Sequence, residues 1–168
     1  MTARAIPIAQ VVTTRGRSIA AVWLIVGGAA LVVAGFFLPW FQGDGVLALR
    51  TFSGFGLAQD LDTLTSSMET VMGGSLSPLL FYVAPAGAVG VALYAVLAGA
   101  SAVSRLFSVT VGLYGLALAA AVLVVAMTPV TDATRLLGAP SWGLGVTAFG
   151  AAVMVAVGLW RGERDDGA

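Results

Sequence analysis

Four long runs without a charged residue are the feature that most constrains this chain. They cover residues 19–40, 78–103, 106–128 and 141–160. A helix rises about 1.5 Å per residue, so each run is long enough to cross the roughly 30 Å hydrocarbon core of a bilayer. A helix on the surface of a soluble protein needs a polar face, whereas these runs are apolar all round. We therefore predict an all-α membrane protein, a four-transmembrane-helix bundle that forms one domain over residues 1–168.

The composition excludes several kinds of chemistry. Mean hydropathy is +1.00, and charged residues make up 10 % of the chain, against about 25 % in soluble domains. Cys and His are absent and all eight basic residues are Arg. This removes disulfides, thiolate and imidazole metal ligands, an imidazole general base and a lysine Schiff base. We predict no catalytic residue, no metal site and no cofactor, and no basic patch indicates a nucleic-acid partner.

The positions of the arginines set the expected orientation. Six of the eight lie in the two tails and in the connection between the second and third runs, while Arg50 and Arg135 lie on the other side. Arg-rich segments stay in the cytoplasm. The preference for Arg over Lys, with abundant Ala, Val and Gly, is typical of a GC-rich bacterial genome. We expect a multi-pass protein of the bacterial inner membrane with both termini cytoplasmic.

The first outer loop, residues 41–77, is too long for a bare connection, so we expect structure in it. Val46–Leu57 is largely apolar and is either a short hairpin or an extended strap. Asp60–Met72 is predicted to be an amphipathic helix, because apolar residues recur three or four apart and Gly73-Gly74 follows. Its apolar face must pack on the bundle, the lipid interface or a partner protein. The side chains expected on that face are Leu61, Leu64 and Met68.

Small residues four apart in the runs are expected at helix contacts, because they let helix backbones approach closely in a membrane. The pattern leaves open whether they pack within the bundle or against other subunits. The pairs are Ala30/Ala34, Ala86/Gly90, Ser108/Gly112, Gly115/Ala119 and Ala148/Ala152.

The second and third runs are joined by about two residues at Ser104-Arg105, which predicts a tight antiparallel hairpin. Pro85 is expected to kink the second helix. Tyr94 and Tyr114 lie eleven and nine residues from Arg105, at similar expected depth. Each hydroxyl needs a partner in hydrocarbon, so we expect a bond between the two or to a backbone carbonyl; a substrate site is the alternative.

Tryptophans fall near the ends of the runs, where amphipathic rings meet the membrane interfaces. We expect Trp23 and Trp160 at the inner interface, and Trp40 and Trp142 at the outer one.

The segment Phe37-Leu38-Pro39-Trp40, followed by Ser53-Gly54, resembles a pattern in uncharacterised four-span bacterial membrane proteins. The layout, with a long first outer loop and both ends inside, is also similar to that of claudins. The claudin loop signature of Gly-Leu-Trp and two Cys is absent, so neither resemblance implies an activity.

The pattern as a whole favours a non-catalytic accessory or scaffold subunit of a larger membrane complex, with membrane lipid and other membrane subunits as partners. The alternative is a transporter or carrier of a lipid or another apolar molecule. An enzyme would need acid, base or metal ligands near the interface. The spacing of the outer carboxylates favours no mechanism; these are Asp44, Asp60, Asp62, Glu69 and Asp132.

The orientation can be tested with single cysteines, since the chain has none of its own. We predict that Thr2→Cys and Gly167→Cys variants stay unlabelled when an impermeant thiol reagent is added to intact cells, and react after the cells are opened. Labelling of either tail in intact cells would place that terminus outside.

Overall fold

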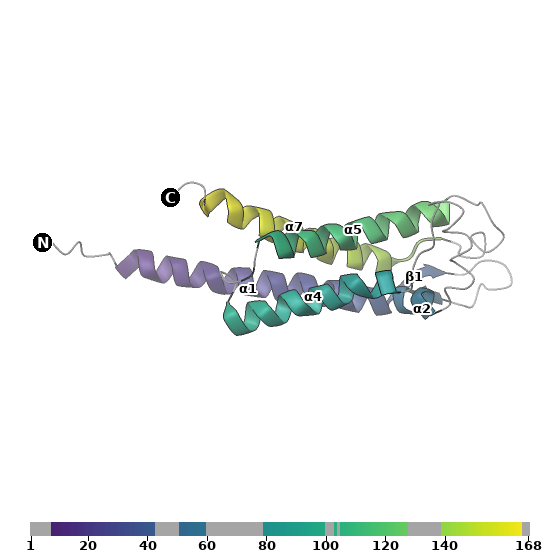
Figure 1. Cartoon of the computed structure of the whole chain (residues 1–168), viewed down its shortest axis with the longest axis horizontal. Coiled ribbons are helices and arrows are strands. Elements are labelled where there is room, and N and C mark those ends of the chain that lie inside the picture. Colours follow the sequence, from purple (N-terminus) through teal and green to yellow (C-terminus); the bar gives the residue numbers. More distant parts are fainter. Residues whose placement is uncertain are drawn as a thin grey trace, which may run out of the picture.

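The computed structural model describes residues 8–42, 51–59, 79–99, 103, 105–127 and 139–165. Four long helices lie side by side, and the short elements gather at the end of the bundle opposite the two termini (Figure 1). We name these two ends the cap end and the terminal end. In chain order the elements are α1 (Ile8–Phe37), β1 (Pro39–Gln42), β2 (Thr51–Ser53), α2 (Gly54–Gln59), α4 (Leu79–Ala98), α5 (Arg105–Met127) and α7 (Trp142–Asp165).

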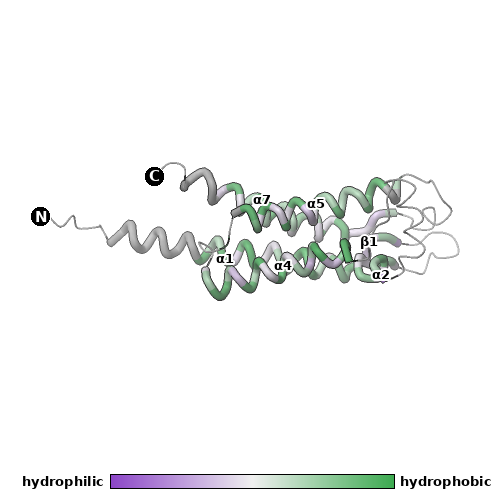
Figure 2. The backbone as a smooth tube through the Cα atoms, in the orientation of Figure 1, coloured by the Kyte–Doolittle hydropathy of each residue, from purple (hydrophilic) through white to green (hydrophobic). Residues whose placement is uncertain are grey.

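Within the described residues, four helical segments are long and apolar enough to cross a membrane. Figure 2 shows apolar residues along all four. This confirms the predicted fold class, and the chain is a multi-pass membrane protein. The segments are Ile19–Phe37, Leu79–Ala98, Leu106–Val124 and Trp142–Trp160.

Burial in the bundle repeats at alternating steps of three and four residues, the 3.5-residue period of helices that pack as in coiled coils. On α5 the buried positions are Ser108, Gly112, Gly115, Ala119 and Val122. The same spacing holds on the other helices, and small side chains occupy many of these positions. The buried residues at this spacing are Ala21, Ile25, Gly28, Val32 and Gly35 on α1; Phe81, Ala84, Ala88, Val91 and Ala95 on α4; and Gly143, Thr147, Gly150, Met154 and Val157 on α7. Residues next to some of them, namely Ala29, Phe36, Leu144, Ala151 and Gly158, are buried as well.

Helices α1 and α7 touch through glycines spaced seven residues apart. A Cβ added to Gly150 would lie 2.6 Å from the Gly28 carbonyl oxygen, and one added to Gly35 would lie 2.6 Å from the Thr147 nitrogen. At the cap end, a Cβ on Gly143 would lie 2.5 Å from the Pro39 carbonyl oxygen. Only glycine lets the two backbones approach this closely, so these glycines set the separation of α1 and α7.

The other face of α7 packs on α5, again through small residues. A Cβ on Gly112 would lie 2.8 Å from the Ala151 carbonyl oxygen, and one on Gly115 would lie 3.1 Å from the Ala151 Cβ. The Ser108 hydroxyl donates a hydrogen bond of 3.1 Å to the Met154 carbonyl oxygen. Helix α7 therefore lies between α1 and α5, while α4 packs mainly on α1.

Helix α1 ends at Phe37, three residues earlier than predicted, because a proline at position 39 disfavours the helical conformation of the residue before it. The indole Nε1–H of Trp40 donates a 2.8 Å hydrogen bond back to the Gly35 carbonyl oxygen. That carbonyl is in the last turn of α1 and needs a partner from outside the helix. Trp40 is fully buried, so its predicted place in the outer aromatic belt is wrong.

Strand β1 joins three segments of the chain at the cap end. It pairs antiparallel with β2, with an irregularity at Trp40. On its other edge the Ser141 N–H donates to the Trp40 carbonyl oxygen at 2.6 Å, and the Gln42 N–H donates to the Ala139 carbonyl oxygen at 3.2 Å. The chain entering α7 is thereby fixed to the chain leaving α1. We call β1, β2, α2 and residues 139–141 the cap.

The first outer loop is structured where it is described. Within the predicted stretch Val46–Leu57, Thr51–Ser53 is a strand that pairs with β1 and α2 begins at Gly54, while residues 46–50 lie outside the described residues. The Ser53 hydroxyl accepts a 3.0 Å hydrogen bond from the Gly56 N–H and caps α2. The predicted helix Asp60–Met72, with Leu61, Leu64 and Met68, lies outside the described residues.

The connection between α4 and α5 is longer than predicted. Helix α4 ends at Ala98, and Gly99 follows with φ 83°, the left-handed conformation that commonly ends a helix at glycine. Helix α5 begins at Arg105, six residues after Gly99, and Gly99 and Val103 are the described residues between the two helices. The predicted tight hairpin is therefore wrong, and α4 and α5 share the smallest of the four contacts between neighbouring long helices. Pro85 lies inside α4, as predicted.

The α1–α7 contact predicts a strong position dependence for glycine replacement. Gly35→Ala should lower the free energy of unfolding by about 1–3 kcal/mol, because its methyl group overlaps Thr147. Gly27→Ala is the matched control, since nothing lies within 4 Å of an added Cβ there, and alanine favours a helix by up to about 1 kcal/mol. Unfolding in detergent micelles, followed by circular dichroism, measures both. Equal effects of the two changes would contradict this packing.

Candidate functional site

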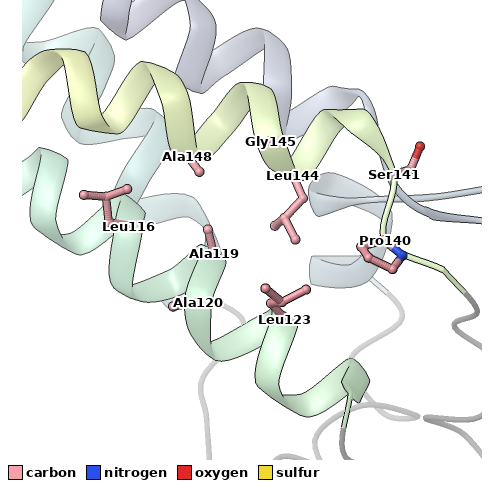
Figure 3. A pocket seen from close by; sticks show the side chains of 9 residues that line it. All are labelled: Leu116, Ala119, Ala120, Leu123, Pro140, Ser141, Leu144, Gly145 and Ala148. Atoms are coloured by element: carbon pink, nitrogen blue, oxygen red, sulfur yellow. The ribbon is translucent and has the colours of Figure 1, made fainter.

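A lateral groove lies between α5 and α7. Its volume is about 490 Å³. Leu123 and Leu144 point toward each other across it near the cap end, and Ala119 lies one turn further along α5 toward Leu116 (Figure 3). The lining is apolar apart from the Ser141 hydroxyl. The residues that line it are Leu116, Ala119, Ala120, Leu123, Pro140, Ser141, Leu144, Gly145 and Ala148.

The groove opens because α5 and α7 are close at one level and apart at another. Toward the terminal end, a Cβ on Gly112 would lie 2.7 Å from the Val155 side chain, so no space remains between the helices. Toward the cap end, the hydrogen bond from Ser141 to Trp40 and the contact of Gly143 with Pro39 fix α7 against the α1 side. On α5, the buried positions that follow Gly112 and Gly115 toward the cap end are Ala119 and Val122, which carry side chains and do not allow so close an approach.

The outward face of α4 is a second candidate surface. Ala86 and Gly90 each lie two residues from the fully buried Ala88, about 200° around the helix, so they point away from the bundle. Both are exposed, and nothing lies within 4 Å of a Cβ added to Gly90. The larger side chains of Val83 and Leu93 are exposed on either side of them. This forms a narrow, small-residue waist on the surface of α4.

The predicted packing residues thus divide into two groups. Ser108, Gly112 and Gly115 are buried and contact α7. Ala86 and Gly90 are exposed among the described residues, so packing against another subunit stays a prediction for them.

The two tyrosines have different surroundings. The Tyr114 hydroxyl donates a 2.7 Å hydrogen bond to the Leu80 carbonyl oxygen, a backbone partner of the predicted kind. The predicted burial of the Tyr94 hydroxyl is wrong, because this side chain is 51 % exposed. Helix α4 ends only four residues after Tyr94, so the ring lies about 6 Å from the helix end, where a tyrosine reaches the membrane interface.

The remaining tryptophans lie on the bundle surface. Trp23 is 70 % exposed, Trp142 is 62 % exposed and Trp160 is 45 % exposed. Trp142 is the first residue of α7, so it marks the level at which the cap meets the membrane span.

The sequence pattern of small residues four apart missed the glycines at the contact between α1 and α7. Gly28 and Gly35, like Gly143 and Gly150, are seven residues apart, and a search limited to four-residue spacing does not pair them. A search for small residues at 3.5-residue spacing would have found both sets.

The hydrogen bond from Tyr114 predicts unequal effects for the two tyrosines. Tyr114→Phe removes the bond to Leu80 and should lower the free energy of unfolding by about 0.5–1.5 kcal/mol, the range for such bonds in membrane proteins. Tyr94→Phe should change it by less than about 0.5 kcal/mol, as is usual for surface positions. Unfolding in detergent micelles compares them, and a larger loss for Tyr94→Phe would contradict the assignment.

Comparisons with known proteins supply no relative from which a function could be carried over. No protein-family model, no curated protein and no solved structure matches this chain. The resemblance based on Phe37-Leu38-Pro39-Trp40 therefore stays a prediction, and function has to be argued from the geometry of the bundle.

Proposed function

We propose that this chain is a non-catalytic accessory or scaffold subunit that packs against another membrane protein through the outward face of α4. The single observation that carries the proposal is the exposed waist at Ala86 and Gly90. Side chains this small give a neighbouring helix close access to the α4 backbone. In lipid, such close contact is a main source of helix association, since burial of apolar surface provides little.

The use of small residues elsewhere in the bundle supports this reading. At Gly112 and Gly150, a missing side chain is matched by the backbone or side chain of a facing helix. At Gly90 the same kind of residue has no such match among the residues that the structure describes. A helix from another subunit would complete at α4 the type of contact that the bundle already uses internally.

The proposal includes the membrane in which the protein lies and its orientation there. The arginine distribution favours a cytoplasmic position for both termini. The preference for Arg over Lys, with abundant Ala, Val and Gly, favours a bacterial protein and hence the bacterial inner membrane. The cap would then stand on the outer side, and its partner-facing surface would include the predicted face of Leu61, Leu64 and Met68.

A second candidate function, a carrier for a lipid or another apolar molecule, is favoured by the groove between α5 and α7. Its walls lie within two of the membrane spans, and its lining is almost wholly apolar. The groove runs along only the cap half of the bundle, so it reaches one leaflet. It therefore suits a resident lipid better than transport across the bilayer.

Replacement of Gly90 tests the accessory role. Gly90→Leu should fold, because nothing lies within 4 Å of the added Cβ, but it should fill the waist and abolish association with the partner. The measurement is purification of the tagged chain in mild detergent, with stoichiometric membrane proteins identified by mass spectrometry. Wild-type chain should retain a partner that Gly90→Leu loses.

The matched control is Ala117→Leu on α5. Ala117 is also exposed, but its helix neighbour Leu113 already presents a large side chain there. This variant should keep the partner. Equal recovery of the same partner with Gly90→Leu and with wild-type chain, both folded by circular dichroism, would rule out the α4 face as the contact.

A further inference from the structure

We propose that the groove between α5 and α7 is a binding site for one acyl chain of a phospholipid in the leaflet at the cap end. This inference goes beyond the accessory role, since it concerns a different face of the bundle. It rests on the depth, length and lining of the groove.

The depth of the groove places it in hydrocarbon. Its walls belong to spans Leu106–Val124 and Trp142–Trp160. Trp142, 62 % exposed, lies beside Ser141 and Pro140 at the cap-end mouth and marks the membrane interface. A lateral recess below that level in a bilayer is filled by an acyl chain unless a protein covers it.

The groove is short enough to lie within one leaflet. From Leu116 to Leu123 the α5 wall rises over seven residues, roughly 10 Å. Half of the bilayer core is roughly 15 Å. At the end of the groove that faces the terminal end of the bundle, Val155 packs on Gly112 and closes the space between the helices. A transmembrane helix needs contact over several turns, whereas this groove offers about two.

The lining suits a chain whose polar end is at the interface. Ala119, Gly145 and Ala148 leave room for methylene groups between the larger Leu116, Leu123 and Leu144 (Figure 3). Ser141 lies at the cap end, with its hydroxyl oxygen directed away from the leucines and toward the cap-end surface (Figure 3). A phospholipid bound here would have its ester groups near Ser141 and one chain descending past Leu144 toward Leu116.

The test uses the purified chain in vesicles of phosphatidylglycerol and phosphatidylethanolamine that contain a trace of phospholipid with a photoactivatable diazirine on its acyl chain. After illumination, mass spectrometry maps the labelled residues. We expect labelling of the groove walls to exceed several-fold that of other exposed positions in the same leaflet. Because no partner protein is present, the result does not depend on the proposed accessory role.

Two variants fill the groove from opposite walls. Gly145→Leu has open space around the added Cβ, and Ala120 is exposed, so Gly145→Leu and Ala120→Leu should both fold. Each should reduce labelling of the groove walls several-fold. Gly27→Leu, the same change at an open position on α1, should leave it unchanged. Uniform labelling of all lipid-facing residues, or labelling of the groove unaffected by both filling variants, would overturn the site.

Discussion

The close approach of α1 and α7 is the contact on which the rest of the bundle depends. Lipid tails are as apolar as the helices, so the helices gain little from burial and must gain from contact at short range. The backbones of α1 and α7 can approach this closely because glycines lie at the contact: Gly28 and Gly35 on α1, and Gly143 and Gly150 on α7. The cap then joins the chain leaving α1 to the chain entering α7, through Trp40 and Ser141. A pair of antiparallel helices joined in this way forms a frame for the other two.

The positions of α4 and α5 follow from this frame. Helix α5 meets the second face of α7 at Gly112 and Gly115, and it separates from α7 where the cap fixes the entry of α7 against α1. The groove thus results from two contacts at different levels of the bundle. One holds α7 against α5 toward the terminal end, and the other holds α7 against α1 at the cap end. Helix α4 packs mainly on α1 and exposes more of its surface than α1 or α7, which is why its outward face is available to a partner.

Hydropathy was enough to predict the four spans, since a charge-free run of this length has few other structures open to it. The ends of the spans depended on single residues. Pro39 stopped α1, and Gly99 stopped α4 before Val103. The early end of α4 moved Tyr94 to the helix end, so the expected pairing of Tyr94 with Tyr114 at one depth was wrong.

Hydropathy could not show which face of each helix is inside, because both faces are apolar. The information lies in side-chain size. On α5, Ser108, Gly112, Gly115 and Ala119 are buried, while large residues such as Leu106 and Leu113 face outward. Ala86 and Gly90 fall outside the 3.5-residue repeat of α4, so their four-residue spacing did not indicate an internal contact. The capping role of Trp40 depends on a chain reversal that sequence position alone does not reveal.

Site-specific photo-crosslinking in native membranes tests the central claim, that the α4 waist is a protein contact, most directly. A photoreactive amino acid at Ala86 should yield one dominant protein adduct of defined mass. The same residue at Ala117 on α5 should yield lipid adducts. If Ala86 yields only lipid adducts while the chain is folded and in its native membrane, the waist faces lipid and the account of this chain as an accessory subunit fails.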